Sequence, residues 1–258
     1  MPEPDDRPMG ILADPNPDRS LFATLDGIVY ARHPVRTHLV TASDDPSEVV
    51  RRYAAPLGID SAIVAVSERM IAITQGRSYP MTSIRPGRLA RFLVRFVTRP
   101  GYGIGLGTAE TMQLAISEVG APRILLAAAV SGLTKPFGVH GLFYRIAGRQ
   151  AAAIDGPTSY TIPPYNQAAT LGPRDPDGAA RRIAQAIGVP VAVIDANDAG
   201  CNVLGVSHDL NRRWVERVFA DNPLGQAAEQ TPICVVSRVA WPADEPLPDE
   251  PRRRLTPP

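Results

Sequence analysis

Two short apolar runs that each end on an acidic residue most constrain what this chain can fold into. Residues 151–155 read Ala-Ala-Ala-Ile-Asp, and residues 189–195 read Val-Pro-Val-Ala-Val-Ile-Asp. Short apolar runs bounded by turn residues are typical of buried strands. Such strands carry Asp155 and Asp195 to the carboxyl-terminal edge of a sheet, where open α/β sheets bind their ligands. The pattern predicts an acidic site at a sheet edge.

An acidic turn lies between the two runs and opens onto a predicted helix over 179–187. Residues 171–178 read Leu-Gly-Pro-Arg-Asp-Pro-Asp-Gly and contribute Asp175 and Asp177. Carboxylates gathered in this way suit Mg²⁺ or Mn²⁺, which take oxygen ligands and commonly bind together with phosphates. Asp-Gly and Asp-Pro pairs also form turns and helix caps, so each single aspartate has that structural interpretation as well.

Composition indicates a globular protein without an obvious charged partner. The chain has 258 residues, of which 44% are hydrophobic, enough for one large domain or two small ones. A formal net charge of +1 gives no overall field toward nucleic acid or membrane, and we expect neither as a partner. No apolar stretch approaches the ~20 residues of a membrane span. The acidic start lacks the apolar core of a signal peptide, which predicts a cytoplasmic location.

Arginine and cysteine usage narrows the chemistry further. Lys135 is the only lysine among 27 basic residues, so an anion site has to use arginine, which binds phosphate or carboxylate through two parallel hydrogen bonds. Cys201 and Cys234 are too few for a disulfide scaffold and lack metal-site spacing, and we expect both to be buried thiols. The four histidines show no zinc-hydrolase spacing, and no Gly-x-Ser-x-Gly motif is present. No catalytic residue is assigned.

The chain divides into a folded part over 21–240 and proline-rich tails at 1–20 and 241–258, which are predicted to be disordered. Helices and strands alternate irregularly, which favours an α+β or mixed α/β fold with mixed sheets. Thr108 is a candidate N-cap and Gly120 a stop for one helix. Helices are predicted over 45–53, 88–97, 108–119 and 179–187. A β-rich segment is predicted within 27–40, and strands are predicted over 61–66, 67–77, 123–131, 141–146 and 233–236, in addition to the two apolar runs.

Three segments allow two interpretations each. The glycine-rich residues 101–107 precede a helix and could bind phosphate there, but a flexible linker or lid fits equally because no P-loop or dinucleotide motif is complete. The amide-rich residues 222–232 could line a site or form a capped turn. Phe92, Phe96 and Val97 form an apolar stripe beside arginines, which is typical of a core and less often of an interface. Those arginines are Arg88, Arg91, Arg95 and Arg99.

Taken in order, the motifs resemble the γ-glutamyl ligases of deazaflavin coenzyme F-420 biosynthesis (coenzyme F-420-0:L-glutamate ligase). The likeness covers roughly residues 34–239 and is that of a divergent member. It is carried by Pro-Val-Arg-Thr-His-Leu-Val at 34–40 with the acidic step Asp44–Asp45, and by Ile-Val-Ala-Val-Ser-Glu-Arg at 63–69 followed by Gln-Gly-Arg at 75–77. Ile-Arg-Pro at 84–86, the two apolar runs and the Asp-Pro-Asp turn complete it.

The resemblance implies specific roles for these residues. It implies a fold of two interleaved subdomains with mixed sheets, with a subdomain insertion at about 101–190, and a homodimer. It implies that Asp155 and Asp195 bind metal and share one cluster. Asn197 and Asp198 follow as second-rank ligands. The residues that it implies for nucleotide or substrate binding are Arg36, Ser67, Glu68, Arg77, Asp175 and Asp177.

The implied reaction is amide formation driven by GTP, that is, an acid–amino-acid ligase. A carboxylate acceptor takes the γ-phosphoryl group, and the amine of L-glutamate then displaces phosphate from the acyl phosphate. The implied cofactors are Mg²⁺ or Mn²⁺, with K⁺ as an additional ion, and GTP is a co-substrate. Divalent ions and arginines would neutralise the crowded phosphates and carboxylates.

The chain also departs from the family. After Asp195 the family continues with two arginines, whereas this chain reads Ala-Asn-Asp-Ala-Gly-Cys-Asn. Those arginines would hold an anionic acceptor, so the metal site carries over more directly than the acceptor does. The alternative hypothesis is a non-catalytic or repurposed relative that binds a nucleotide or metabolite.

Overall fold

The computed structural model describes residues 16, 19–59, 62–97, 105–135, 141–208 and 210–239. The chain forms two compact units: residues 1–74 together with 175–258, and the intervening residues 75–174. The insertion predicted at about 101–190 overlaps the second unit but differs from it at both ends. The predicted tail 241–258 lies outside the described residues, as does most of the tail 1–20. Both helices and a mixed sheet are present, which confirms the α+β class.

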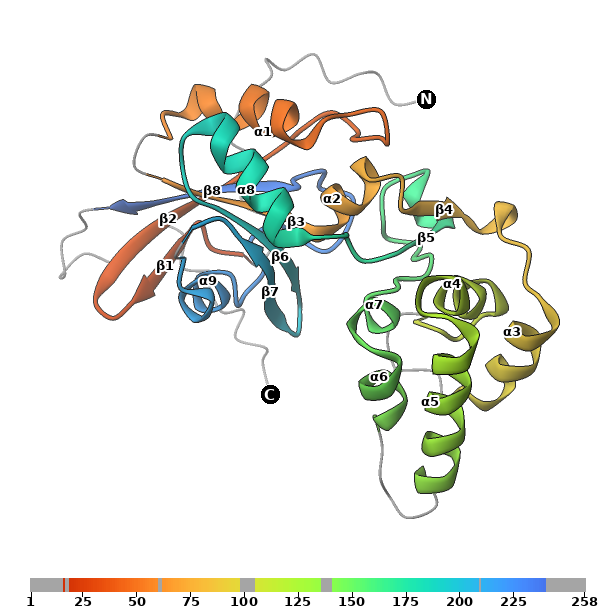
Figure 1. Ribbon diagram of the computed structural model, residues 1–258. Coiled ribbons are helices and arrows are strands. Elements are labelled where there is room, and N and C mark those ends of the chain that lie inside the picture. Colours follow the sequence, from red (N-terminus) through yellow and green to blue (C-terminus); the bar gives the residue numbers. More distant parts are fainter. Residues whose placement is uncertain are drawn as a thin grey trace, which may run out of the picture. The chain divides into compact units, whose positions relative to one another are not determined.

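The first unit is built on a six-stranded sheet in the order β1-β2-β8-β3-β6-β7 (Figure 1). Only the pairing of β3 with β6 is parallel, and the other four pairings are antiparallel. The strand bounds are β1 Phe22–Leu25, β2 Ile28–Val35, β3 Ile63–Ser67, β6 Val191–Asn197, β7 Gly200–Val206 and β8 Ile233–Val239. The strands predicted at 61–66, 189–195 and 233–236 are confirmed.

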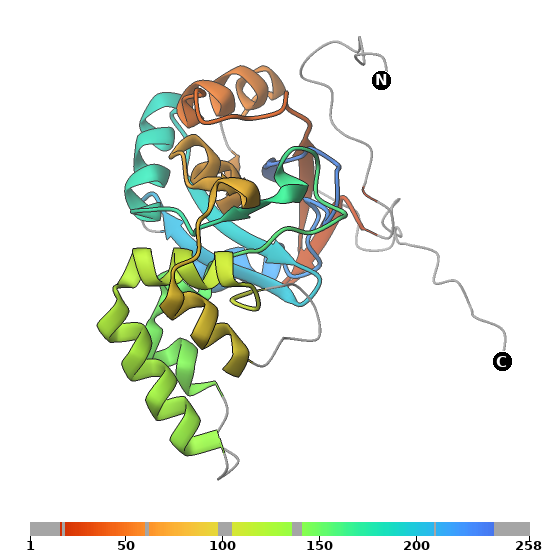
Figure 2. The same cartoon turned by 90° about the vertical axis from the view of Figure 1, so that its right-hand side faces the viewer.

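Helices cover both faces of this sheet. Figure 1 shows α1 (Pro46–Ala54) and α8 (Pro176–Ile187) on one face, with α2 (Glu68–Thr74) beside them, and α9 (Arg212–Val218) on the other face. Figure 2 shows α1 and α8 side by side over the sheet. Under α9, a buried cluster joins Val215, Val218 and Phe219 to Ala65 and Ile194 of the strands. The apolar strand residues are therefore buried on both faces.

Aspartate caps begin two of these helices, which was the structural interpretation left open for these residues, and α8 begins at Pro176, three residues before the predicted start. The Asp45 side chain accepts hydrogen bonds from the backbone N–H groups of Ser47 and Glu48, and proline follows it at the first helical position. Asp175 accepts from the N–H of Gly178 at 3.0 Å and is likewise followed by a proline. Each carboxylate satisfies donors that the first helical turn leaves without partners.

The second unit combines helices with a two-stranded sheet. Thr108 and Thr111 form a reciprocal capping box at the start of α4, which confirms the predicted N-cap. Gly120, at φ 88°, ends α4 and joins it to α5 at a bend of 117°. The elements are β4 Ser78–Pro80 paired antiparallel with β5 Ala168–Thr170, α3 Arg88–Leu93, α4 Ala109–Val119, α5 Ala121–Thr134, α6 Leu142–Ala147 and α7 Arg149–Ala152. Short 3-10 turns occur at Ala55–Leu57, Met81–Ser83, Val94–Phe96 and Tyr165–Gln167.

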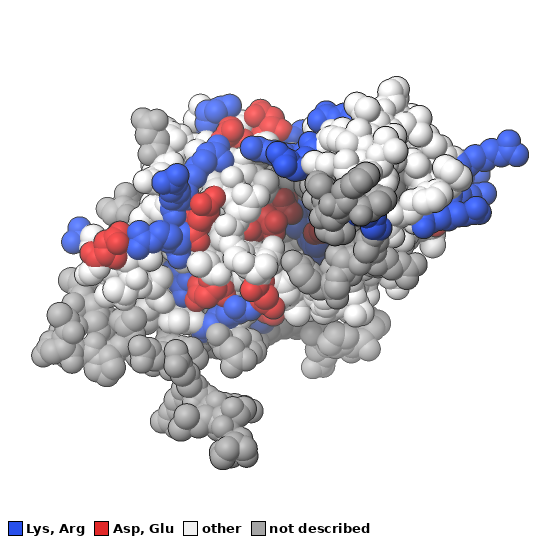
Figure 3. Space-filling view, turned by 90° about the horizontal axis from the view of Figure 1, so that it is seen from below, with Lys and Arg blue, Asp and Glu red and all other residues white. Residues whose placement is uncertain are grey.

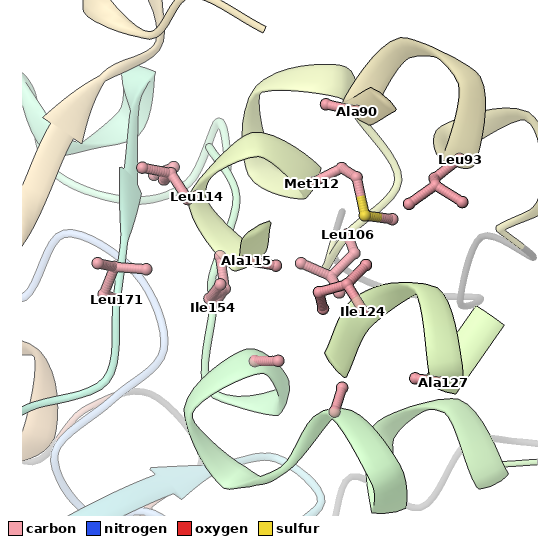
Figure 4. Close-up of a cluster of buried hydrophobic side chains, with 13 residues drawn as sticks. Ala90, Leu93, Leu106, Met112, Leu114, Ala115, Ile124, Ala127, Ile154 and Leu171 are labelled. Atoms are coloured by element: carbon pink, nitrogen blue, oxygen red, sulfur yellow. The ribbon is translucent and has the colours of Figure 1, made fainter. Parts of the chain in front are cut away.

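The second unit has its own hydrophobic core. Met112 of α4, Ile124 of α5 and Leu106 point toward one another in Figure 4, and each is at most 1% exposed. The ends of the unit are tied together, because the Gln75 side chain donates to the Arg174 carbonyl at 2.9 Å and accepts from the Arg174 N–H at 2.7 Å. Of the glycine-rich segment 101–107, residues 101–104 lie outside the described residues.

Four predicted strands are wrong. Residues 68–74 form α2, residues 121–134 form α5 and residues 142–147 form α6, while the apolar run at 151–154 contains the end of α7. Alanine and leucine make up half of residues 121–134, and alanine makes up most of 151–154; both residue types favour helix over strand. Asp155 pairs with Thr170 only through an isolated bridge. Length and apolar content did not distinguish buried strands from buried helices here.

Within the described part of the chain, no single helix is long and apolar enough to span a membrane. The bent pair of α4 and α5 passes that test only when its two helices are taken together.

A close backbone contact in the first unit gives a stability prediction. A Cβ atom on Gly205 of β7 would lie 2.2 Å from the backbone carbon of Pro176, at the start of α8. Gly205→Ala should therefore displace α8 from the sheet and lower the free energy of unfolding by about 1–3 kcal/mol or more. Urea unfolding followed by circular dichroism measures the change.

Gly132→Ala is the matched control, because a Cβ there meets nothing within 4 Å and the position lies inside α5. This variant should be stabilised by about 0.5–1 kcal/mol, since alanine restricts the unfolded chain more than glycine does. Equal effects of the two substitutions would contradict the close packing of α8 on β7.

Candidate functional site

A row of four paired residues crosses the sheet of the first unit. Val35 of β2 pairs with Ile233 of β8, Ile233 pairs with Val66 of β3, and Val66 pairs with Val193 of β6. All four side chains are fully buried. The pairings also show that β2, β3 and β6 run in the same direction. The three strands therefore deliver whatever follows this row to a single edge of the sheet.

Four predicted site residues follow this row directly. Arg36 comes after Val35, and Ser67 and Glu68 come after Val66. Ser67 pairs with Ile194, so Asp195 is the next residue along β6. We call Arg36, Ser67, Glu68 and Asp195 the polar sheet edge. Arg36 is exposed and the other three are partly exposed, so solvent reaches each of them.

The backbone at this edge is fixed by the segment before β8. The N–H of Ser67 donates to the carbonyl of Pro232 at 2.8 Å. Gln230, in the left-handed region at φ 62°, donates from its side chain to the carbonyl of Thr37 at 2.9 Å and accepts the N–H of Thr37 on its own carbonyl at 3.1 Å. The amide-rich residues 222–232 thus hold the ends of β2 and β3. In the sequence, only the high density of amide side chains indicated a role for this segment.

Asn197 and Asp198 form the turn between β6 and β7. The Asn197 side-chain oxygen accepts the N–H of Ala199 at 2.9 Å, and its amide nitrogen lies 3.5 Å from a carboxylate oxygen of Asp195. Asp198 is exposed and forms an ion pair with Arg19. A tight hairpin therefore occupies the position where the resembling family has its two arginines. Asn197 is the second-rank candidate that contacts Asp195.

Asp175 and Asp177 have structural partners. Asp175 caps α8, and a Cβ on Gly178 would lie 1.8 Å from its carboxylate, so only glycine fits under this cap. One oxygen of Asp177 accepts the N–H of Val206 at 2.8 Å and the Arg212 guanidinium at 2.7 Å. Arg212 also donates to the carbonyl of Val203 at 2.9 Å. Asp177 thus joins α8, β7 and α9.

The remaining two predicted residues belong to the second unit. Arg77 forms a buried ion pair with Glu118 at 2.6 Å, their side chains being 5% and 9% exposed, and its Nε donates to the carbonyl of Gly172 at 2.7 Å. Asp155 is exposed and exchanges two backbone hydrogen bonds of 2.9 Å with Thr170. Because Asp155 and Asp195 belong to different units, their shared metal site stays a prediction.

A histidine network lies just beyond the end of β2. The two ring nitrogens of His38 lie 3.0 Å from the Tyr53 hydroxyl and 3.1 Å from an Asp44 carboxylate oxygen. Asp44 also accepts the N–H of Thr41 at 2.7 Å, and this bond is the main reason that its pKa lies below the usual value of 3.8. The acidic step at Asp44–Asp45 therefore orients His38 and caps α1.

Among the described residues, no group of three or more His, Cys, Asp or Glu side chains is arranged to hold a metal ion. Comparison of the sequence with protein-family models finds no match, and comparison with curated proteins finds none either. The ligase resemblance therefore stands on the motifs quoted above.

The buried Arg77–Glu118 pair gives a second prediction. Arg77→Ala and Glu118→Ala should each destabilise the second unit by about 3–5 kcal/mol, because each leaves one charge buried without its partner. The double variant should lose less than the sum of the two, as expected for a coupled pair. Denaturant unfolding of the three variants measures both effects. Full stability of Arg77→Ala would contradict a structural role and return Arg77 to the candidates for binding an anion.

The thiols give a third prediction. Burial, with a smaller contribution from the Asp195 carboxylate, raises the pKa of Cys201 to about 12, and burial raises the pKa of Cys234 to about 12. Near neutral pH both groups are protonated, and a thiol reacts as its thiolate. Neither should be alkylated by iodoacetamide in the native protein, whereas both should react after unfolding. Mass spectrometry counts the adducts, and rapid native labelling of Cys201 would contradict the expectation.

Proposed function

We propose that the chain is an amide-forming ligase that uses GTP and a divalent cation to join an amino acid, L-glutamate in the resembling family, to a carboxylate acceptor. The observation that carries the proposal is the common direction of β2, β3 and β6, which places Arg36, Ser67, Glu68 and Asp195 at one sheet edge. The motifs that carry the family resemblance at 34–40, 63–69 and 189–195 thus end at one edge of the sheet, which supports a shared site. They were quoted from separate parts of the sequence.

The donor set at the polar sheet edge fits a hard divalent cation in ligand type. Asp195 and Glu68 offer carboxylate oxygens, and Ser67 offers a hydroxyl oxygen, which are the ligands that Mg²⁺ and Mn²⁺ take. Asp195 would hold the ion, and the amide nitrogen of Asn197, 3.5 Å from an Asp195 carboxylate oxygen, would help to orient that carboxylate. A bound ion would polarise a phosphoryl oxygen and offset the charge of the nucleotide.

The chain's own groups would bind and orient the substrates. Arg36 is an exposed guanidinium at the same sheet edge as Glu68 and Asp195, and it suits a phosphate or an acceptor carboxylate through two parallel hydrogen bonds. The Ser67 hydroxyl can donate to an oxygen that gains charge as the phosphoryl group is transferred. In that reaction the acceptor carboxylate takes the γ-phosphoryl group from GTP. The amine then attacks the acyl carbon, expels phosphate and forms the amide.

A binding protein without turnover is the second candidate. The specific observation in its favour is that Arg77, Asp175 and Asp177 are engaged in a buried ion pair, a helix cap and a link between elements. The groups left for a nucleotide and two further substrates are then fewer than the resemblance implies. Such a protein would bind a nucleotide or metabolite at the polar sheet edge and act through that binding.

The test is GTP turnover by the purified chain with Mn²⁺, L-glutamate and the deazaflavin carboxylate acceptor, measured as phosphate release. Asp195→Asn should lower the rate of phosphate release by about tenfold to a hundredfold or more. Losses of that size are found even when residues that only support metal ligands are changed. It should also weaken Mn²⁺ binding measured by calorimetry. If Asp155 shares the ion, Asp155→Asn should weaken Mn²⁺ binding to a similar degree.

The control is Asp26→Asn, which removes an exposed carboxylate of the first unit that pairs with Arg217. This variant should bind Mn²⁺ and release phosphate like the unchanged chain. Failure of the unchanged chain to bind either Mn²⁺ or GTP would overturn the ligase proposal. Binding of both without phosphate release would favour the second candidate.

A further inference from the structure

The near-neutral total charge of the chain conceals two units of opposite charge. The second unit, residues 75–174, contains eleven basic and three acidic residues, a formal net charge of +8. The rest of the chain contains sixteen basic and twenty-three acidic residues, a formal net charge of −7. The expectation of no membrane partner rested on the total of +1. The charge of the second unit by itself attracts anionic surfaces.

Exposed apolar side chains are concentrated in the same unit. The large hydrophobic side chains that the described residues expose all lie within 75–174, and Phe96 at 67% and Leu133 at 72% are the most exposed. The full set is Phe92, Phe96, Leu125, Leu126, Leu133, Tyr144 and Tyr160. Figure 3 shows the surface of the helical unit as mostly white, with basic groups along its outer edge. Seven such side chains in one unit, and none among the described residues of the other, make this unit the candidate for an interaction surface.

Helix α5 presents one apolar face to solvent. Ile124 and Ala127 are buried in the core, while Leu126, Ala129 and Leu133, spaced three and four residues apart, are exposed on one side of the helix. Lys135 follows the helix on its opposite side, and the Arg123 guanidinium donates to the carbonyl of Ile146 at 2.8 Å, so this face is apolar throughout. An exposed apolar helix face of this kind can enter the boundary between the headgroups and the acyl chains of a membrane.

Helix α3 and the 3-10 turn after it combine exposed apolar side chains with basic residues. Phe92 and Phe96 contact each other edge to face, with ring centroids 5.2 Å apart, and both are more than half exposed. Phe92 and Phe96 of the stripe predicted from the sequence therefore belong to the surface, whereas Val97 packs against the core together with Ala90 and Leu93. Exposed Arg91 and Arg95 adjoin the two rings in sequence. Aromatic rings beside arginines suit the interfacial region of a bilayer.

Two other partners for this surface, a second copy of the chain and a single-stranded nucleic acid, match these observations less well. Two second units facing each other would bring together like charges of +8. A second unit against the first unit of another copy would place its apolar side chains on a unit whose described residues expose no large hydrophobic side chain. Single-stranded nucleic acid would suit the arginines and the phenylalanines, but the exposed leucines of α5 give its bases no face to stack on.

We propose that residues 75–174 dock the protein on an anionic phospholipid surface, with Leu126 and Leu133 of α5 and Phe92 and Phe96 of α3 entering the interface and the arginines beside them contacting lipid phosphates. An anionic bilayer satisfies both properties of this unit, because it accepts apolar side chains and attracts positive charge. The proposal is independent of the ligase activity, which is assigned to the first unit's sheet edge.

The test is sedimentation of the full chain with vesicles of phosphatidylcholine alone and of phosphatidylcholine mixed with phosphatidylglycerol. Binding is expected only to the mixed vesicles and should weaken as salt is added. Arg91→Gln with Arg95→Gln should weaken binding roughly thirtyfold, from about 1 kcal/mol for each basic residue at an anionic surface. Leu126→Gln with Leu133→Gln should also weaken binding, although it leaves the charge unchanged.

The matched control is Arg181→Gln with Arg182→Gln, which removes two exposed arginines from α8 of the acidic unit and changes the total charge equally. This variant should bind like the unchanged chain, and circular dichroism verifies that all variants are folded. Absence of binding to the mixed vesicles, or equal losses in the two arginine variants, would overturn the proposal. The proposal would also be overturned if light scattering showed a dimer that the leucine variant converts to a monomer. Tighter binding to a single-stranded oligonucleotide than to vesicles would overturn it as well.

Discussion

The first unit depends on the insertion of β8 between β2 and β3. Without this strand, the hairpin of β1 and β2 shares no ladder with the β3-β6-β7 part of the sheet. Bringing residues 233–239 back to the middle of the sheet carries a loop-closure cost, which the burial of Ile233, Cys234 and Val236 offsets. The same strand sets the common direction of β2 and β3. The polar sheet edge therefore follows from where the last strand pairs.

The sequence predicted this unit better than the helical one, for a physical reason. Val-rich runs such as 191–194 are β-branched and bounded by turn residues, and helices beginning at Asp45 and Asp175 carry cap and proline signals that act locally. The runs at 121–134 and 151–154 are also apolar, but they are rich in alanine and leucine, and they pack in the core around Met112 and Ile124. Apolar length alone does not carry that information.

The candidate site shows the same division between local and long-range information. Asp195 and Ser67 could be found from the sequence because each follows an apolar run, but their proximity depends on strand register, which connects distant parts of the chain. The aspartates at 175 and 177 carry the same chemistry, yet a helix cap and an arginine occupy them. The acidic residues of the sequence indicated which segments to consider. Their hydrogen-bond partners in the structure then distinguished the carboxylates that stabilise the fold from those that are exposed to solvent.

The reciprocal bonds between Gln75 and Arg174 have a consequence for how such a chain can change over evolutionary time. These hydrogen bonds hold the two ends of residues 75–174 together. For the first unit, the whole segment therefore acts as a short fixed connection and not as a long flexible loop. The sheet of the first unit takes no strand from 75–174, so this segment can be exchanged, enlarged or lost while α2 and α8 keep their places. The helical unit is, in this sense, a replaceable insertion in a framework of strands.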